Sequence, residues 1–376
     1  MGCMYQMKQT EEIKNELNPE RDNYLIHTFT TNPNLLKSLQ KIQSHFRGLI
    51  TRKKIHKLLN SQILNNFPLN NYSHYSEIQT DKITEDDIRQ LFLKYPSLEN
   101  ENIAVKLKNP VQYDNKAIYY GEWNNDNFRH GRGILWLEGS KYEGYWKNDK
   151  ANIKGKLTHK NGDIYEGEWL DDKADGFGIY TNIDGAQYKG YWKNDKQNGK
   201  GCESWPEGAC YEGDYVNGKK NGHGVFKWND GSEYDGEFFN NNIEGFGTYT
   251  WGDNRKYKGN WKDNKMNGKG EFIYPDGRKY IGEYIDDKMN GRGIFVWPDG
   301  RRYEGDYVNN KKEGNGRFEW SDGRIYEGGW KNGKQDGEGK FYNNRQKKWK
   351  KGIWKEGKRI KWMEDDVLIY MKDNEI

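Results

Sequence analysis

The residues that could carry out covalent or metal chemistry are few, and their spacing forms no known centre. None of the seven histidines stands in an HxxxH or HExxH arrangement that would hold zinc. The run from Asp171 to Gly176 is spaced like a calcium loop, but Lys173 replaces a ligand and Asn182 replaces the closing glutamate. Gly-x-Gly pairs lack the Lys-Ser/Thr of phosphate loops. We therefore predict no catalytic residue, no metal site and no cofactor, and a chain that is not an enzyme.

The first residues could instead accept lipid. Gly2 followed by Cys3 resembles the start of dually acylated proteins, with myristate on the glycine and palmitate on the cysteine. Gln6 departs from the serine or threonine that is usual at this place. One acyl chain binds membranes weakly and two bind stably, so Cys3 would make a membrane contact durable. The alternative is an ordinary terminus without lipid.

A basic amphipathic helix is expected over residues 32–60. Asn32 and Pro33 suit a helix start, and apolar residues recur at steps of three and four from Leu35 to Leu59. No acidic residue occurs between Asp22 and Glu77, whereas this helix carries several lysines and arginines. Such a helix should seek an acidic groove.

Residues 42–52 of this helix resemble the IQ motif, IQxxxRGxxxR, at every fixed position. The resemblance implies binding to calmodulin or a calmodulin-like EF-hand protein. A helix in such a groove would use apolar anchors, a glycine for close approach and arginines directed at carboxylates. The expected contact residues are Ile42, Gln43, Phe46, Arg47, Gly48, Leu49, Arg52 and Ile55. The alternative is a helix that docks on the chain's own repeats or on anionic lipid.

A tyrosine returns every 23 residues, ten times. The series is Tyr119, Tyr142, Tyr165, Tyr188, Tyr211, Tyr234, Tyr257, Tyr280, Tyr303 and Tyr326. Each is followed by glycine at +2 and by Trp, Tyr or Phe at +4. Alternation of this kind predicts strands, and Pro-Asp-Gly runs such as 275–277 predict tight turns with a left-handed glycine. Pairing should then set Tyr234 opposite Phe226 and Gly236 opposite Gly224.

This unit, Tyr-x-Gly-x-Trp followed by Gly-x-Gly-x-Phe-x-Trp, resembles the MORN repeat over residues 119–348. Departures are local, such as Ile153 for a glycine and Asn254 for a turn glycine. The fold class is expected to be mainly β: an elongated single-layer antiparallel array of β-hairpin repeats with an N-terminal α-helical extension. Together with the IQ motif, the chain resembles ciliate or protist MORN–IQ proteins. This implies a cytoplasmic, cytoskeletal or ciliary (axonemal) scaffold.

A single-layer sheet leaves one face of its rings uncovered, which predicts a groove for a protein partner, either a helix or an extended peptide. The expected groove aromatics are Tyr211, Tyr234, Tyr257, Trp261, Tyr280, Tyr303, Trp228, Trp251, Trp297 and Trp320. The alternative is that the rings only fill one another. The opposite face reads as acidic, for example at Glu212 and Asp214. Lysines at the turns, among them Lys220 and Lys312, read as a basic edge.

The amino-acid composition limits which other functional classes are consistent with the chain. Sixty-one basic and 57 acidic residues give a net charge of +4, which does not indicate a nucleic-acid partner. Only 33% of the residues are hydrophobic, so aromatic rings must supply the packing. Three cysteines and no long apolar run favour a reducing, cytoplasmic compartment, with any membrane contact peripheral.

The predicted organisation has five parts. They are a flexible terminus with the candidate acylation residues (1–31), the IQ helix (32–60), a linker with a short capping helix (61–118), ten repeats (119–348) and a degenerate cap and tail (349–376). The short helix should begin at Thr84 with Asp87 completing a capping box, and end at Tyr95. The expected function is a non-catalytic scaffold or adaptor. The alternative is a peripheral membrane protein that binds acidic phospholipids through acyl groups and basic surfaces.

Overall fold

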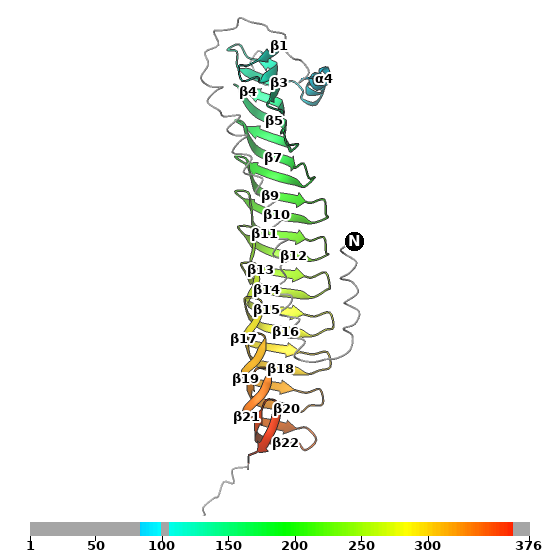
Figure 1. The fold of residues 1–376 in the computed structure, drawn as a ribbon, viewed down its shortest axis with the longest axis vertical. Helices are drawn as coiled ribbons and strands as arrows, with labels where there is room; N and C mark the ends of the chain where they lie inside the picture. Colours follow the sequence, from blue (N-terminus) through cyan, green and yellow to red (C-terminus); the bar gives the residue numbers. More distant parts are fainter. Residues whose placement is uncertain (1–82, 99–104, 364–376) are drawn as a thin grey trace, which may run out of the picture. The chain divides into compact units, whose positions relative to one another are not determined.

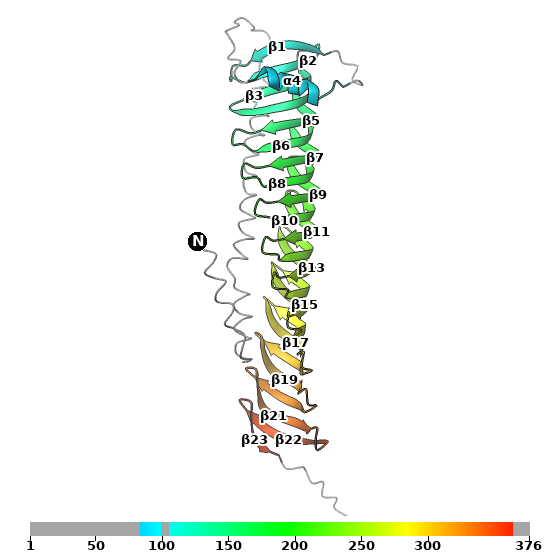
Figure 2. The ribbon, with the colours of Figure 1, turned by 90° about the vertical axis from the view of Figure 1, so that its right-hand side faces the viewer.

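The computed structural model describes residues 83–98 and 105–363, and these fall into two units, each built from antiparallel strands (Figure 1). The amino-terminal unit holds residues 83–98 and 105–243, and the carboxy-terminal unit holds 244–363. Within each unit, every strand pairs with its neighbours in sequence, so the hairpins follow one another in one layer (Figure 2). The mainly β fold of antiparallel hairpin repeats is confirmed.

The first unit contains the helix α4 (Glu85–Lys94) and twelve strands among its described residues. The strands are β1 (Lys106–Gln112), β2 (Ile118–Trp123), β3 (Arg129–Leu137), β4 (Ser140–Lys147), β5 (Lys150–Thr158), β6 (Ile164–Leu170), β7 (Lys173–Thr181), β8 (Gln187–Lys193), β9 (Lys196–Ser204), β10 (Cys210–Val216), β11 (Lys219–Lys227) and β12 (Glu233–Phe239).

The strands of the second unit begin with one that starts two residues before it. They are β13 (Asn242–Thr250), β14 (Lys256–Lys262), β15 (Lys265–Ile273), β16 (Lys279–Ile285), β17 (Lys288–Val296), β18 (Arg302–Val308), β19 (Lys311–Glu319), β20 (Ile325–Lys331), β21 (Lys334–Asn343), β22 (Lys348–Lys355) and β23 (Lys358–Trp362).

The hairpin turns have the predicted chemistry. Gly277 adopts φ +87° and donates its backbone N–H to the carbonyl of Tyr274 at 2.9 Å, which closes the turn. Asn254 takes the same left-handed conformation at φ +67°, so the chain turns there without glycine. The turns fix the register, and Tyr234 lies opposite Phe226 with Gly236 opposite Gly224, as predicted.

A β-bulge recurs at the other end of the hairpins, which the sequence pattern did not predict. The register of β10 and β11 shifts between Gly213 and Tyr215, and Gly222 on β11 has φ +74°. A bulge inserts an unpaired residue and bends the strand. It explains why the first glycine of each Gly-x-Gly pair is needed.

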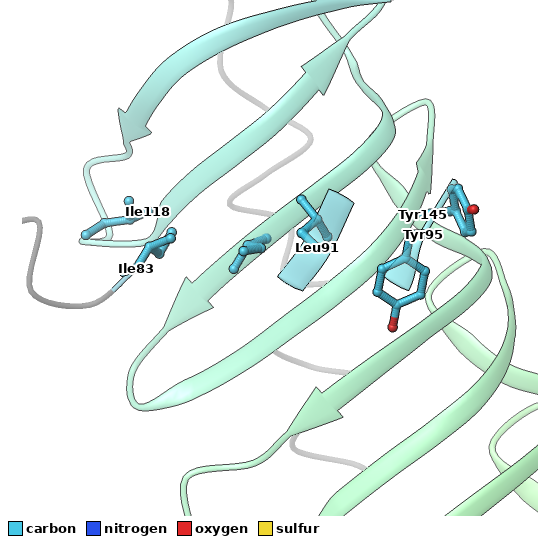
Figure 3. Packing of buried hydrophobic residues seen from close by; sticks show 6 residues of the cluster. Ile83, Leu91, Tyr95, Ile118 and Tyr145 are labelled. Atoms are coloured by element: carbon cyan, nitrogen blue, oxygen red, sulfur yellow. The ribbon is translucent and has the colours of Figure 1, made fainter. Parts of the chain in front are cut away.

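The start of the first unit is closed by two elements, α4 and β1. Helix α4 has the predicted capping box, since Asp87 N–H donates to the Thr84 hydroxyl at 3.1 Å and Thr84 N–H donates to the Asp87 carboxylate at 3.0 Å. Leu91, 1% exposed, packs with Ile118 and Tyr145 on the face opposite the tyrosine series (Figure 3). The free edge of β2 is covered by β1, a strand that the sequence analysis did not predict.

Candidate functional site

The tyrosines of the 23-residue series form a buried row on one face of the sheet, called here the tyrosine face. Tyr211 lies across two paired glycines: a Cβ on Gly213 or Gly224 would come within 2.3 or 2.4 Å of the Tyr211 hydroxyl oxygen. The hydroxyl donates to the backbone carbonyl three residues later, at 2.9 Å for Tyr119. The glycines are therefore required because the phenol occupies the space of their side chains.

Each tyrosine ring is held between two further rings. The ring centroid of Tyr119 lies 5.1 Å from that of Trp123 in its own repeat and 5.5 Å from that of Trp146 in the next repeat, and both pairs are edge-to-face. The Trp146 indole N–H donates to the carbonyl of Gly133 at 3.1 Å. Edge-to-face pairs of this kind stabilise beyond the area that they bury. The tyrosine row is thus the core of each unit.

This burial corrects the predicted set of groove aromatics. Tyr211, Tyr234, Tyr257, Tyr280 and Tyr303 are all 0% exposed, and Trp228 and Trp261 are buried as well. They cannot contact a partner in this conformation, because the neighbouring repeats enclose them on both sides. The remaining members of the set, Trp251, Trp297 and Trp320, are partly exposed.

Those three tryptophans belong to a second line of rings in the carboxy-terminal unit. We call the four rings Trp251, Tyr274, Trp297 and Trp320 the strand-end row. Each comes two residues after the last buried phenylalanine or tyrosine of a strand, where that strand ends. Together with those residues they form an unbroken series, with neighbouring centroids 4.4 to 6.1 Å apart. The series is Tyr249, Trp251, Phe272, Tyr274, Phe295, Trp297, Phe318, Trp320 and Phe341.

An arginine lies over each ring of the strand-end row. The guanidinium carbons of Arg255, Arg278, Arg301 and Arg324 are 5.3, 4.6, 5.3 and 5.4 Å from the ring centroids. Each guanidinium also pairs at 2.7 to 2.8 Å with the aspartate of its turn. Hydrogen bonds from Arg324 lower the pKa of Asp322 below its usual range. Sequence reasoning missed Tyr274 and these arginines, although their 23-residue period was a usable signal.

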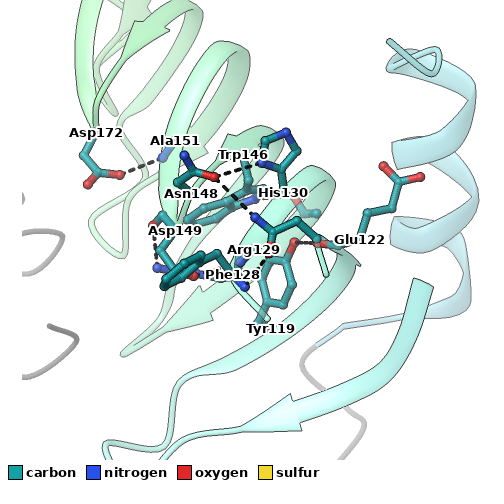
Figure 4. A network of polar contacts seen from close by, with 12 residues as sticks. Tyr119, Glu122, Phe128, Arg129, His130, Trp146, Asn148, Asp149, Ala151 and Asp172 are labelled. Carbon is teal, nitrogen blue, oxygen red and sulfur yellow. Dashed lines mark hydrogen bonds and ion pairs between the residues drawn. The ribbon is translucent and has the colours of Figure 1, made fainter. Parts of the chain in front are cut away.

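Three repeats place a cation on the tyrosine face, opposite the +4 aromatic residue of the preceding strand. Arg129 lies 4.2 Å from the Trp146 ring centroid and pairs with Asp149 at 3.0 Å (Figure 4). Lys220 is 4.7 Å from the Tyr211 ring centroid and pairs with Glu203 at 2.6 Å. The third is Lys312. Most other repeats have a neutral residue at this place, for example Ala151, Met266 and Met289. Lys220 and Lys312 are therefore not part of a basic edge.

The turn that precedes these residues links one repeat to the next. Asp172 accepts the backbone N–H of Ala151 on its carboxylate at 2.7 Å and donates its own N–H to the Ala151 carbonyl at 2.9 Å. The carboxylate bond is drawn in Figure 4. Asn241 makes the same side-chain bond to Lys220. Burial raises the pKa of Asp172, and likewise of Asp287, to about 6.

The face opposite the tyrosines carries mixed charges, which corrects the expectation of an acidic face. Asp214 pairs with Lys200 at 2.8 Å, and Asp235 lies 3.0 Å from the imidazole of His223. Other carboxylates on this face hold the bulge, as Glu168 accepts the backbone N–H of Phe177 at 3.0 Å. These acids have structural partners because the neighbouring strands present bases and amides to them.

Several predicted residues lie outside the described part of the chain. They are the acylation residues Gly2 and Cys3 and the IQ residues Ile42, Gln43, Phe46, Arg47, Gly48, Leu49, Arg52 and Ile55. Within residues 83–98 and 105–363, no group of three or more His, Cys, Asp or Glu side chains could hold a metal ion. Cys202 and Cys210 are free thiols. No helix in those ranges has the length and apolarity to cross a membrane.

Comparison with protein families identifies the repeat. The model of the MORN repeat family matches ten segments that cover more than half of the chain. They are residues 119–139, 142–164, 165–187, 188–210, 211–233, 234–254, 257–277, 280–301, 303–323 and 326–345. No curated protein matches the chain.

Solved structures give only weak similarity. The TCP domain of Drosophila melanogaster SAS-4 (dCPAP), in complex with a proline-rich motif of Ana2, is 13% identical over 50% of this chain and 98% of its own, with a TM-score of 0.27. A mutant of the TCP10 domain of Danio rerio CPAP is 11% identical over 69% of this chain and all of its own, with a TM-score of 0.21.

Proposed function

This chain belongs to the MORN repeat family, and from that premise we propose that it is a non-catalytic scaffold that binds a protein partner along the strand-end row. The observation that supports the proposal is the partial exposure of Trp251, Tyr274, Trp297 and Trp320 in one continuous aromatic series. Rings of the tyrosine row are enclosed, whereas these rings are open to a partner.

The composition of the strand-end row suits a protein partner. Tryptophan, tyrosine and arginine are the residues that most often dominate protein interfaces. Each ring is stiffened by an arginine that is itself fixed by its turn aspartate, as Arg301 is by Asp299. A rigid contact loses little side-chain entropy when a partner binds.

The spacing of the strand-end row favours a helix that crosses the strands. Successive rings are two strands apart, which corresponds to about 10 Å. Seven residues of an α-helix rise by about the same distance, ~10.5 Å. A partner helix with apolar residues at heptad spacing would therefore place one side chain beside each ring. An extended peptide would need a contact about every three residues.

The test compares ring variants in a pull-down from native extract, read by quantitative mass spectrometry. Trp297→Ala with Trp320→Ala should abolish recovery of the partner. Phe239→Ala is the matched control, since it removes an exposed ring, 58% exposed, outside the row. Equal recovery by wild type, double variant and control would refute the role of the row.

The IQ motif supports a second part of the scaffold proposal, recruitment of calmodulin or a similar EF-hand protein by residues 32–60. Isothermal titration of the full chain with calmodulin, with and without calcium, tests this part. Replacing Ile42 and Arg47 with alanine should remove the heat of binding. Unchanged heat in that variant would assign the contact to another surface.

A lipid-binding role is favoured by one observation, the basic end of the carboxy-terminal unit. Its exposed bases are Arg345, Lys347, Lys348, Lys350, Lys351, Lys355, Lys358, Arg359 and Lys361. Clusters of this kind attract anionic membranes. Vesicles with and without phosphatidylserine distinguish the roles: Lys350→Glu with Lys351→Glu should release the protein from anionic vesicles if lipid is bound, and Trp297→Ala should not.

A further inference from the structure

Lys312 on β19 has an unusual environment for a lysine amine. Its Nζ lies 5.1, 4.7, 4.7 and 4.9 Å from the ring centroids of Trp297, Tyr303, Phe318 and Trp330. The ammonium has no carboxylate or hydrogen-bond acceptor among residues 244–363, and the side chain is partly exposed. Opposite it in the register, Tyr307 keeps a buried hydroxyl that likewise lacks a partner there.

The other two cations at this place in the repeat show what is missing. Arg129 has Asp149, in the turn of the following repeat, and Lys220 has Glu203, two strands earlier on the same face. In the repeat that contains Lys312, Gly333 occupies the position equivalent to Asp149, and Phe295 occupies the position equivalent to Glu203. Both internal sources of a carboxylate are therefore absent at Lys312.

We propose that the Lys312 ammonium is the anchor for an aspartate or glutamate side chain of the protein partner, inserted between rings of the strand-end row. This inference rests on the proposed function and names the chemistry of that site. The partner carboxylate would occupy the role that Glu203 has beside Lys220, and apolar residues on either side of it would pack on Trp297 and Trp320.

The charge balance around Lys312 supports an anion. Arg301, a like charge, acts electrostatically on the Lys312 amine, and Arg301 is itself paired with Asp299 at 2.7 Å. Tyr303 and Tyr307 are buried, which raises the pKa of both phenols above their usual value and keeps them neutral. Glu313, the next residue on β19, is engaged with the backbone N–H of Asn332 at 2.8 Å. Ring faces and a charge-assisted hydrogen bond would then hold the ion pair together.

Binding of a carboxylate at Lys312 should also depend on pH. Burial, with a smaller contribution from Arg301, lowers the pKa of Lys312 to about 7. A bound carboxylate favours the charged amine, so binding takes up a proton. Since only the ammonium form binds the anion, affinity should fall about fivefold between pH 7 and pH 8, as the protonated fraction falls.

The experiment follows the ¹³Cε signal of Lys312 by NMR in the full chain, assigned from the Lys312→Met variant. The probes are two capped tripeptides, acetyl-Leu-Glu-Leu-amide and acetyl-Leu-Gln-Leu-amide, titrated to millimolar concentration. The glutamate peptide should move the Lys312 signal saturably, more weakly at pH 8 than at pH 7, and the glutamine peptide should not. Lys311→Met, which removes an exposed neighbouring charge, should leave the response unchanged.

The outcomes separate this inference from the proposed function. If both peptides move the indole signals of Trp297 and Trp320 equally while the Lys312 signal stays fixed, the aromatic surface stands and the carboxylate anchor is overturned. A Lys312 signal that does not respond to the glutamate peptide overturns the anchor in every case. The pull-down with ring variants judges the proposed function independently.

Discussion

Met289 and Lys312 stand in the same position of consecutive repeats, on β17 and β19, each opposite a tyrosine of the preceding strand. Met289 is 5% exposed and makes a neutral core contact, whereas Lys312 brings an amine into the same kind of environment. The pair shows that the fold accepts an apolar side chain here. Replacing Lys312 with methionine therefore measures how much the charge of the amine costs the stability of the repeat.

Lys312→Met should stabilise its repeat at neutral pH. The folded chain lowers the pKa of Lys312 from 10.5 to about 7, so folding opposes the charged form. The cost is present when the amine is charged in the unfolded chain and declines as pH rises from 7 toward 10.5. We expect a gain of about 2 kcal/mol at pH 7, which shrinks as the pH rises and is nearly gone above about pH 10.5. Hydrogen exchange of β18 and β19 amides measures it, and no added protection would contradict the assignment.

Asp172→Asn should also stabilise, with the opposite dependence on pH. Burial raises the pKa of this carboxyl from 3.8 to about 6, so the folded chain favours the protonated form. Wild-type stability from this group therefore increases as pH falls from about 7 to 4. Asparagine removes the charge, and its side-chain oxygen can still accept the hydrogen bond from the Ala151 backbone N–H. The chain already has an asparagine in this role, since Asn241 accepts the backbone N–H of Lys220.

The expected gain for Asp172→Asn is about 2 kcal/mol at pH 8 and close to zero below pH 4. Hydrogen exchange of the β5 and β6 amides reads the effect. Asp171→Asn is the matched control, because Asp171 is exposed, pairs with Lys150 at the surface and accepts one long hydrogen bond, 3.3 Å, from the Asn152 side-chain amide. Equal effects of the two variants would show that burial of Asp172 is not the cause.

Gly224→Ala should disrupt one part of the array and spare the rest. Its Cβ would meet the Tyr211 hydroxyl at 2.4 Å and ring carbons at 2.6 Å, inside a ring stack that cannot move aside. We expect a loss of about 3 kcal/mol in β10 and β11. Amides of β19 and β20 should keep their protection, since each repeat contacts only its neighbours.

The control for Gly224→Ala is Gly231→Ala, at a turn with φ +81° and no atom within 4 Å of a new Cβ. It should cost about 1 kcal/mol from backbone conformation alone. A larger loss at Gly231 than at Gly224 would contradict the view that the phenol, rather than the turn, sets the glycine requirement.

The fold could be predicted from the sequence because one period controls it. Each repeat places the tyrosine, two glycines and the +4 ring at alternating positions, and the turn glycine then fixes the register seen between β11 and β12. The strand β1 escaped prediction because it lies outside the period and contains Pro110. The register shifts between Lys108 and Val111, which accommodates the proline next to a bulge.

The candidate site was predicted only in part, because exposure depends on contacts between repeats. The sequence spacing of the aromatic residues does not reveal that Tyr280 is enclosed by Tyr284 and Tyr307, whereas Trp297 remains partly exposed. Lys220 reads as a turn lysine until the structure shows Glu203, 17 residues earlier, at its amine. A signal was present, however: a charged residue at a repeat position that is otherwise mostly neutral.

The most direct test of the central claim is site-specific photocrosslinking in native extract. A benzophenone amino acid replaces Asp299, in the turn beside the strand-end row, or Glu207, the residue at the same repeat position in the amino-terminal unit. If a partner binds along the strand-end row, position 299 should give a discrete adduct with a partner protein and position 207 should give none. Adducts of equal yield from both positions, or from 207 alone, would contradict binding along the strand-end row.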